Sequence, residues 1–161
     1  MKVLAFTIGA DRYGLPLQAV ARVLPAMALK LIPGAPDFVA GLMDLHGTPV
    51  PVLDVSRLAG LVVEQVWLDS RIVLIDYVID HMSEHTADSG ATRQLGLLVE
   101  HVAGIENVAD AALQDPGIDG APFLGPVAAS LQIVDVAQLL APDVRALLFP
   151  RDAVPATGAL A

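Results

Sequence analysis

The sequence predicts an all-β protein made of two related small barrels, with a few short helices. Three observations lead to this fold class. Apolar runs of about four to eight residues are separated by Gly, Pro and Asp, which is typical of strands joined by turns. The spacing between runs leaves no room for the roughly 10–15-residue crossover helices of a parallel sheet. The chain also carries an internal repeat, which predicts two similar halves.

Seven segments have the apolar character of strands, because each contains a short run rich in Val, Leu, Ile or aromatic residues bounded by turn formers. In chain order they are residues 3–9, 13–20, 38–45, 48–55, 71–78, 93–100 and 129–136. Their lengths and spacing favour antiparallel barrels or a sandwich. The polar segment 79–93 is typical of a long hairpin loop between two of these strands.

Helix is expected in three short pieces. These follow "PGAP" at residues 33–36, follow Asp54, and lie within 135–149, where Pro142 should divide or end the helix because proline lacks the N–H that an interior position needs. Residues 151–161 have too little to bury and are predicted to be a flexible tail. The folded part is therefore expected to be one domain, residues 1–150, made of two pseudo-repeated sub-barrels.

Two independent pairs of segments carry the internal repeat. They are Tyr13–Val23 with Leu95–Ile105, at an offset of 82, and Val52–Gly60 with Ile133–Ala141, at an offset of 81. The first pair aligns Gly14 with Gly96, and the second aligns Asp54 with Asp135. Each aspartate follows a strand and precedes a short apolar turn, so we predict that both cap the first helical turn rather than take part in catalysis.

Composition excludes several classes of function. Apolar residues make up 55% of the 161 residues, yet no run reaches the roughly 18 needed to suggest a membrane span, so a soluble, cytoplasmic protein without direct membrane insertion is expected. Cysteine is absent, which rules out disulfides and thiolate sites. A net charge of −9 with two lysines argues against nucleic acid as a partner, because phosphate binding needs a basic surface.

Histidine is the residue type that leaves an enzymatic alternative open. His81 and His85 have the i, i+4 spacing that could place two imidazoles on one helical face, which suggests a metal-assisted enzyme using nearby carboxylates. Glu84 does not follow the first histidine directly, as the zinc-protease pattern requires, and the surroundings are typical of a loop. No serine lies in a G-x-S-x-G context. We therefore predict no catalytic residue, no cofactor and no metal.

Several motifs, in order, resemble the CheW family of chemotaxis coupling proteins over residues 1–142. They are "FTIGADRYGLPLQAVARVLP", "IPGAPDFVAGLMDLHGTPVPVLDVSRLAG", "LGLLVEHVAGIENV" and "VDVAQLL". The resemblance implies two five-stranded β-barrels packed side by side and no enzymatic activity. It implies an adaptor that links the cytoplasmic tip of a methyl-accepting chemoreceptor to the regulatory domain of a CheA-type histidine kinase, recruited to membrane-bound receptor complexes. "GLMDLHGTPVPVLD" and "FLGPVA" are most similar to the WspB-type subgroup of surface-sensing pathways.

The resemblance also implies a receptor-facing groove. The residues that it places there are Val20, Arg22, Val23, His46 and Val99. Family members typically carry arginine where this chain has His46, and an acidic residue where it has Arg22. Relative to the family, position 46 loses a positive charge and position 22 gains one. Because these two changes are opposite in charge, we hypothesise that His46 and Arg22 are neighbours in space. His46 itself has two interpretations, a reactive imidazole or a surface group on a hairpin between two strands.

Overall fold

The computed structural model describes residues 1–61, 70–79, 91–117, 120 and 122–150. The described residues form nine strands. They are β1 (Lys2–Ile8), β2 (Asp11–Pro16), β3 (Val20–Pro25), β4 (Val39–Leu45), β5 (Thr48–Asp54), β6 (Arg71–Ile79), β7 (Ala91–Asn107), β8 (Leu124–Ala128) and β9 (Leu131–Val134). The helices are α1 (Val55–Leu58), α2 (Pro142–Leu148) and the 3-10 turns η1 (Leu17–Ala19), η2 (Asp110–Ala112) and η3 (Val136–Gln138).

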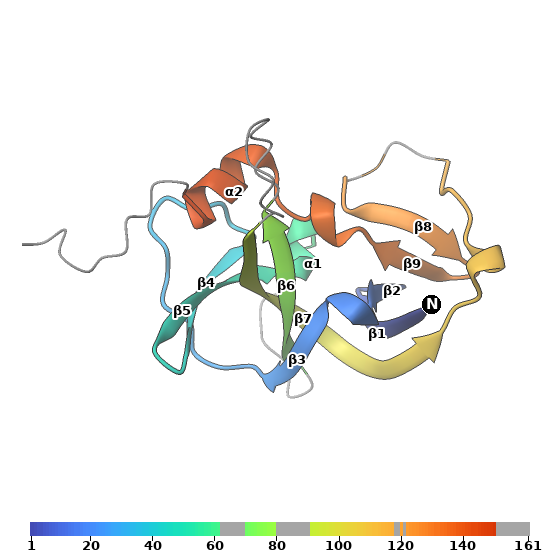
Figure 1. Ribbon diagram of the computed structural model, residues 1–161, viewed down its shortest axis with the longest axis horizontal. Coiled ribbons are helices and arrows are strands. Elements are labelled where there is room, and N and C mark those ends of the chain that lie inside the picture. The colour runs from blue at the N-terminus through green and yellow to red at the C-terminus, as the bar shows by residue number, and fades with distance from the viewer. Residues whose placement is uncertain (62–69, 80–90, 118–119, 121, 151–161) are drawn as a thin grey trace, which may run out of the picture.

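The strands form two five-stranded sets that lie side by side (Figure 1), which confirms the predicted fold class. The first barrel contains β1, β2, β8, β9 and the C-terminal part of β7. The second barrel contains β3, β4, β5, β6 and the N-terminal part of β7. Strand β7 is 17 residues long and belongs to both barrels, so the two sets are joined by one continuous strand.

The pairings of the two barrels match one to one. In the first barrel Gly14 of β2 pairs antiparallel with Ala5 and parallel with Ile133. In the second barrel Gly96 of β7 pairs antiparallel with Leu74 and parallel with Val52. The two glycines that the repeat aligns therefore have equivalent neighbours. This correspondence agrees with the predicted internal repeat, although the domain boundary at residue 150 stays a prediction.

A central apolar cluster lies between the barrels. Strand β1 directs Leu4, Phe6 and Ile8 into this central cluster and its alternate residues into the core of the first barrel. Strand β6 does the same from the other side: Val73, Ile75, Tyr77 and Ile79 enter the central cluster, while Ile72 and Leu74 enter the core of the second barrel. Because successive side chains of a strand point to opposite faces, residues 3–6 of β1 and residues 72–75 of β6 are buried on both sides of the strand and form continuous apolar runs.

The structure corrects several of the predicted elements. The segment after "PGAP" is not a helix but a single turn at Asp37 and Phe38, in which the N–H of Val39 donates a hydrogen bond to the carbonyl of Pro36. Strand β4 begins at Val39, so only two residues lie between "PGAP" and the strand, which is fewer than one helical turn needs. Strand 13–20 ends at Pro16, where η1 begins. Strands β3 and β8 were not predicted, because the first is largely exposed and the second contains Gly125 and Pro126.

Helix α2 covers one end of the second barrel (Figure 1). Pro142 occupies the first turn of α2 and separates it from η3, as predicted, because the first helical position needs no N–H partner. The ring of Tyr77 stacks on Phe149 with centroids 6.1 Å apart, and the Arg145 guanidinium lies 5.9 Å from the Tyr77 centroid. No helix in the described parts of the chain is long and apolar enough to cross a membrane.

An alanine at position 96 should clash with its neighbours, because an added Cβ would lie 2.9 Å from Val52 Cγ2 and 3.1 Å from Ile72 Cγ2. We expect Gly96→Ala to lower the free energy of unfolding by about 1–3 kcal/mol, measured by urea denaturation. Val52→Ala removes the methyl group in the way, so the double variant should lose at least about 0.5 kcal/mol less than the sum of the single variants. Strict additivity would contradict the steric explanation.

Candidate functional site

Strand β3 forms one border of the second barrel and carries three of the predicted partner-binding residues. Among the strands that the structure describes it pairs only with β6, with Arg22 opposite Leu74 and a register shift at Ala21. Val20 is partly buried and packs against the central cluster, whereas Arg22 is exposed and Val23 is 41% exposed. An exposed strand edge with apolar side chains is a surface that a partner protein can cover.

His46 lies at the tip of the hairpin that joins β4 to β5. Leu45 pairs with Thr48, so His46 and Gly47 form a two-residue loop, and both have positive φ angles, 51° and 87°. These angles are typical of a type I′ turn. The N–H of Gly47 also donates a 2.8 Å hydrogen bond to Asp44 Oδ1. The exposed imidazole is therefore a surface group on a hairpin, which is the second of the two interpretations.

Val99 differs from the other predicted site residues because its side chain is buried. It is 1% exposed and belongs to the central cluster. The strand alternation of β7 directs Val99 inward and the partly exposed Glu100 outward. Val99 can therefore support a binding surface through packing, but its side chain cannot contact a partner in this structure.

Arg22 and His46 belong to different parts of the second barrel. Arg22 lies on β3, and His46 lies in the turn between β4 and β5. Both side chains are exposed, and within the described residues no hydrogen bond or ion pair joins them. Their adjacency stays a hypothesis. The structure brings Val20, Arg22 and Val23 together on β3 and places His46 at a separate tip.

The two aligned aspartates are helix caps, as predicted. Asp54 Oδ1 accepts a hydrogen bond of 3.3 Å from the N–H of Arg57 at the start of α1. Asp135 Oδ1 accepts a 3.2 Å bond from the N–H of Ala137 at the start of η3. Asp54 also forms an ion pair with Arg57, whose Nε lies 3.6 Å from Oδ2.

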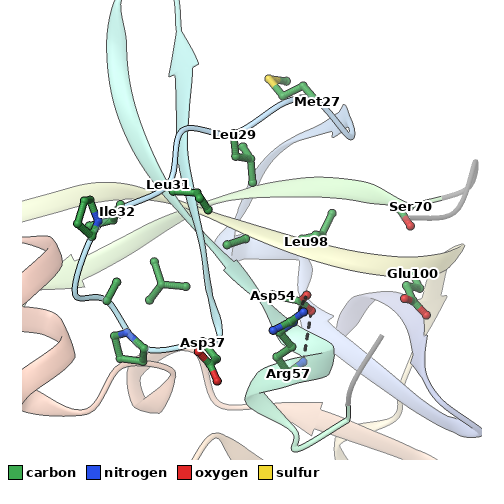
Figure 2. Close-up of a pocket in the computed structure, with 15 residues that line it drawn as sticks. Met27, Leu29, Leu31, Ile32, Asp37, Asp54, Arg57, Ser70, Leu98 and Glu100 are labelled. Carbon is green, nitrogen blue, oxygen red and sulfur yellow. Dashed lines mark hydrogen bonds and ion pairs between the residues drawn. The ribbon is translucent and has the colours of Figure 1, made fainter. Parts of the chain in front are cut away.

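A groove beside α1 is the one feature of the site region that sequence reasoning missed. It has a volume of about 790 Å³ and lies between the connection from β3 to β4, the start of α1 and the middle of β7 (Figure 2). We call it the α1 groove. Its apolar walls include Leu29, Leu31 and Leu98, and its polar rim includes Asp37, Asp54, Arg57 and Glu100. The available signal was the apolar "LKLI" directly before the two prolines of "PGAP", in a segment too short and proline-rich for a helix.

The histidines of the enzymatic alternative, His81 and His85, lie outside the described residues. Within the described ranges no group of three or more His, Asp or Glu side chains could hold a metal ion. The described part of the chain therefore offers no observation in favour of a metal centre.

Comparison with known proteins identifies relatives of this chain. The CheW-like domain family matches residues 2–144. The chain is 22% identical over 91 residues to the chemotaxis protein CheW of Helicobacter pylori, an alignment of 52% of this chain and 55% of that protein, so it spans about half the length of this curated relative. The crystal structure of the scaffolding protein TtCheW from Thermoanaerobacter tengcongensis is similar, with a TM-score of 0.74 and 21% identity over 89% of this chain and 94% of that chain.

The geometry of the His46 turn predicts which substitutions it tolerates. Asparagine adopts a positive φ readily, so His46→Asn should keep or slightly raise the free energy of unfolding. A β-branched side chain is strained at this φ, so His46→Val should lower it by about 1–2 kcal/mol. Thermal and urea denaturation measure both effects. Equal stability of the two variants would show that the turn conformation does not depend on residue 46.

Proposed function

Because the chain belongs to the CheW-like domain family, we propose that it is a non-enzymatic adaptor that couples a methyl-accepting chemoreceptor to a CheA-type histidine kinase. The observation that carries this proposal is the extent of the family match, which spans both barrels from residue 2 to residue 144. The proposed partners are the cytoplasmic tip of the receptor and the regulatory domain of the kinase. The protein would act in the cytoplasm, recruited to membrane-bound receptor complexes.

The architecture supports an adaptor on physical grounds. An adaptor must present separate faces that two partners can cover at the same time, and the two barrels each expose their own strand borders and hairpin tips. Exposed apolar side chains occur on both barrels, with Val23 on the second and Ile105 on the first. Such groups, surrounded by polar residues, are the usual centres of protein interfaces.

Signal transmission by an adaptor requires a difference in affinity. A receptor can change kinase activity through this protein only if its signalling states bind or position the complex differently. The departures at Arg22 and His46 alter the charge of the proposed receptor-facing surface. They favour a dedicated receptor over a general one, in keeping with the similarity to the WspB-type subgroup, which stays a prediction.

The strand β3 surface can be tested with a charge introduced at Val23. Val23→Asp should weaken binding of a receptor-tip fragment at least about tenfold, because it places a desolvated carboxylate in the interface. Binding of the kinase regulatory domain to the same variant should change little. Ile105→Asp is the matched control, since Ile105 occupies the equivalent position on β7 and is 61% exposed. Equal loss in the two variants, measured by calorimetry, would argue against a receptor surface on β3.

The proposed proximity of Arg22 and His46 can be tested by a double-mutant cycle. His46→Arg alone should place two cations together and weaken receptor binding or stability, whereas adding Arg22→Glu should restore the loss. For an exposed pair we expect a coupling energy of about 0.5–1 kcal/mol, smaller at high salt. Denaturant midpoints and receptor-fragment affinities at two salt concentrations measure it. Additive effects in both assays would show that the two residues do not touch.

A further inference from the structure

The α1 groove has the dimensions of a binding site and is not filled by the described side chains around it. Its volume of about 790 Å³ falls in the range of sites that hold small ligands or a few residues of a peptide. One wall is the connection from β3 to β4, and the other is formed by α1 and β7 (Figure 2). The two walls come from segments far apart in the sequence, so the groove is a property of the folded second barrel.

Leucine side chains leave an apolar surface open in this groove. Leu31 is 77% exposed, the highest value among the large apolar residues described, and its side chain lies toward the opposite wall in Figure 2. Met27 is 40% exposed and lines the same wall. Contact between these apolar side chains and water is unfavourable in free energy, and a bound partner that covers them would remove this contact.

The backbone of the same wall offers an unpaired strand edge. The backbone N–H and carbonyl of Lys30 form hydrogen bonds of 2.9 and 2.7 Å with Leu42 of β4. The chain here is therefore extended, and the backbone groups of Lys30 that face β4 are hydrogen-bonded. In an extended segment the backbone N–H and carbonyl groups of successive residues point to opposite edges, so those of Leu29 and Leu31 point away from β4. Among the described residues, Leu29 and Leu31 have no backbone hydrogen bond. An extended peptide could therefore pair with this edge by strand addition.

The charges around the groove favour a cationic occupant. Its lining residues include three carboxylates, from Asp37, Asp54 and Glu100, and one guanidinium, from Arg57, which pairs with Asp54. The chain as a whole carries a net charge of −9. An acidic rim around an apolar floor is complementary to a ligand that combines bulky apolar side chains with Lys or Arg.

We propose that the α1 groove binds a short extended peptide segment of a partner protein, in which apolar residues alternate with Lys or Arg. The apolar side chains contact Leu31 and Leu98, the basic side chains lie near Asp37, and the peptide backbone pairs with residues 29 and 31. This site is separate from the β3 surface and does not rest on the coupling function proposed above.

The test uses a fluorescein-labelled heptapeptide in which Leu and Lys alternate, with two matched peptides as controls. In the first control each Lys is replaced by Glu, and in the second each Leu is replaced by Ser. Fluorescence anisotropy with the full chain should show binding of the Leu-Lys peptide, at least tenfold weaker binding of both controls, and weakening of the Leu-Lys peptide by salt. Absence of binding up to millimolar protein, or equal binding of the acidic peptide, would overturn the proposal.

Protein variants then locate the site. Leu31→Ser and Asp37→Lys change exposed side chains, so both proteins should fold, and each should weaken binding of the Leu-Lys peptide at least fivefold. Ile105→Ser, which removes an exposed apolar group from the other barrel, should leave it unchanged. Circular dichroism confirms that each variant is folded. Unchanged binding to Leu31→Ser, or equal loss in Ile105→Ser, would refute this location.

Receptor and kinase fragments are measured on the same variants. Loss of peptide binding with receptor and kinase binding intact supports a separate peptide site. If the Leu-Lys peptide competes with the receptor or kinase fragment for the chain, the groove is part of those interfaces and the proposal of a separate site is wrong. Failure of the coupling function itself would appear as absent receptor and kinase binding in the unmodified chain, whatever the peptide does.

Discussion

The two-sided burial of β1 and β6 is the constraint on which the rest of the structure depends. Each strand gives alternate side chains to its own barrel and the others to the central cluster, so neither barrel has a complete apolar core of its own. Truncating a buried Leu or Ile typically costs about 2–5 kcal/mol, and a strand buried on both faces has such residues at nearly every position. The barrels are therefore held together by the same residues that form them.

This central packing explains how the molecule can carry several surfaces at once. The apolar residues of β1 and β6 pack inside the molecule. The parts that face solvent are β3, the hairpin tips and the connection from β3 to β4. These outer parts pack against the core through a few side chains, such as Val20 and Leu29, and expose others to solvent. The departures at Arg22 and His46 lie in such parts, where a substitution changes recognition more than stability.

The parts of the fold that could be predicted from sequence are those whose signal is local. The doubly buried part of β6, residues 72–75, is a continuous apolar run, and Asp54 and Asp135 cap the helical turns that follow β5 and β9. Strand β3 was missed because its exposed residues have no apolar periodicity. Val99 was placed on the surface by resemblance, whereas the direction of its side chain depends on the register of β7 with β6. The α1 groove depends on contacts between distant segments, where Gly41 lets the carbonyl of Lys30 approach to a point 2.5 Å from where a Cβ would lie.

The continuity of β7 has a mechanical consequence. A 17-residue strand has a contour of about 55 Å and crosses both barrels without a flexible linker, so a load applied to one barrel reaches the other through covalent bonds and two hydrogen-bonded ladders. The strand is not a straight beam, because His101 and Gly104 have positive φ angles of 49° and 110° and the ladder with β1 shifts register there. The bend in β7 therefore lies close to the point where the strand passes from the second barrel to the first.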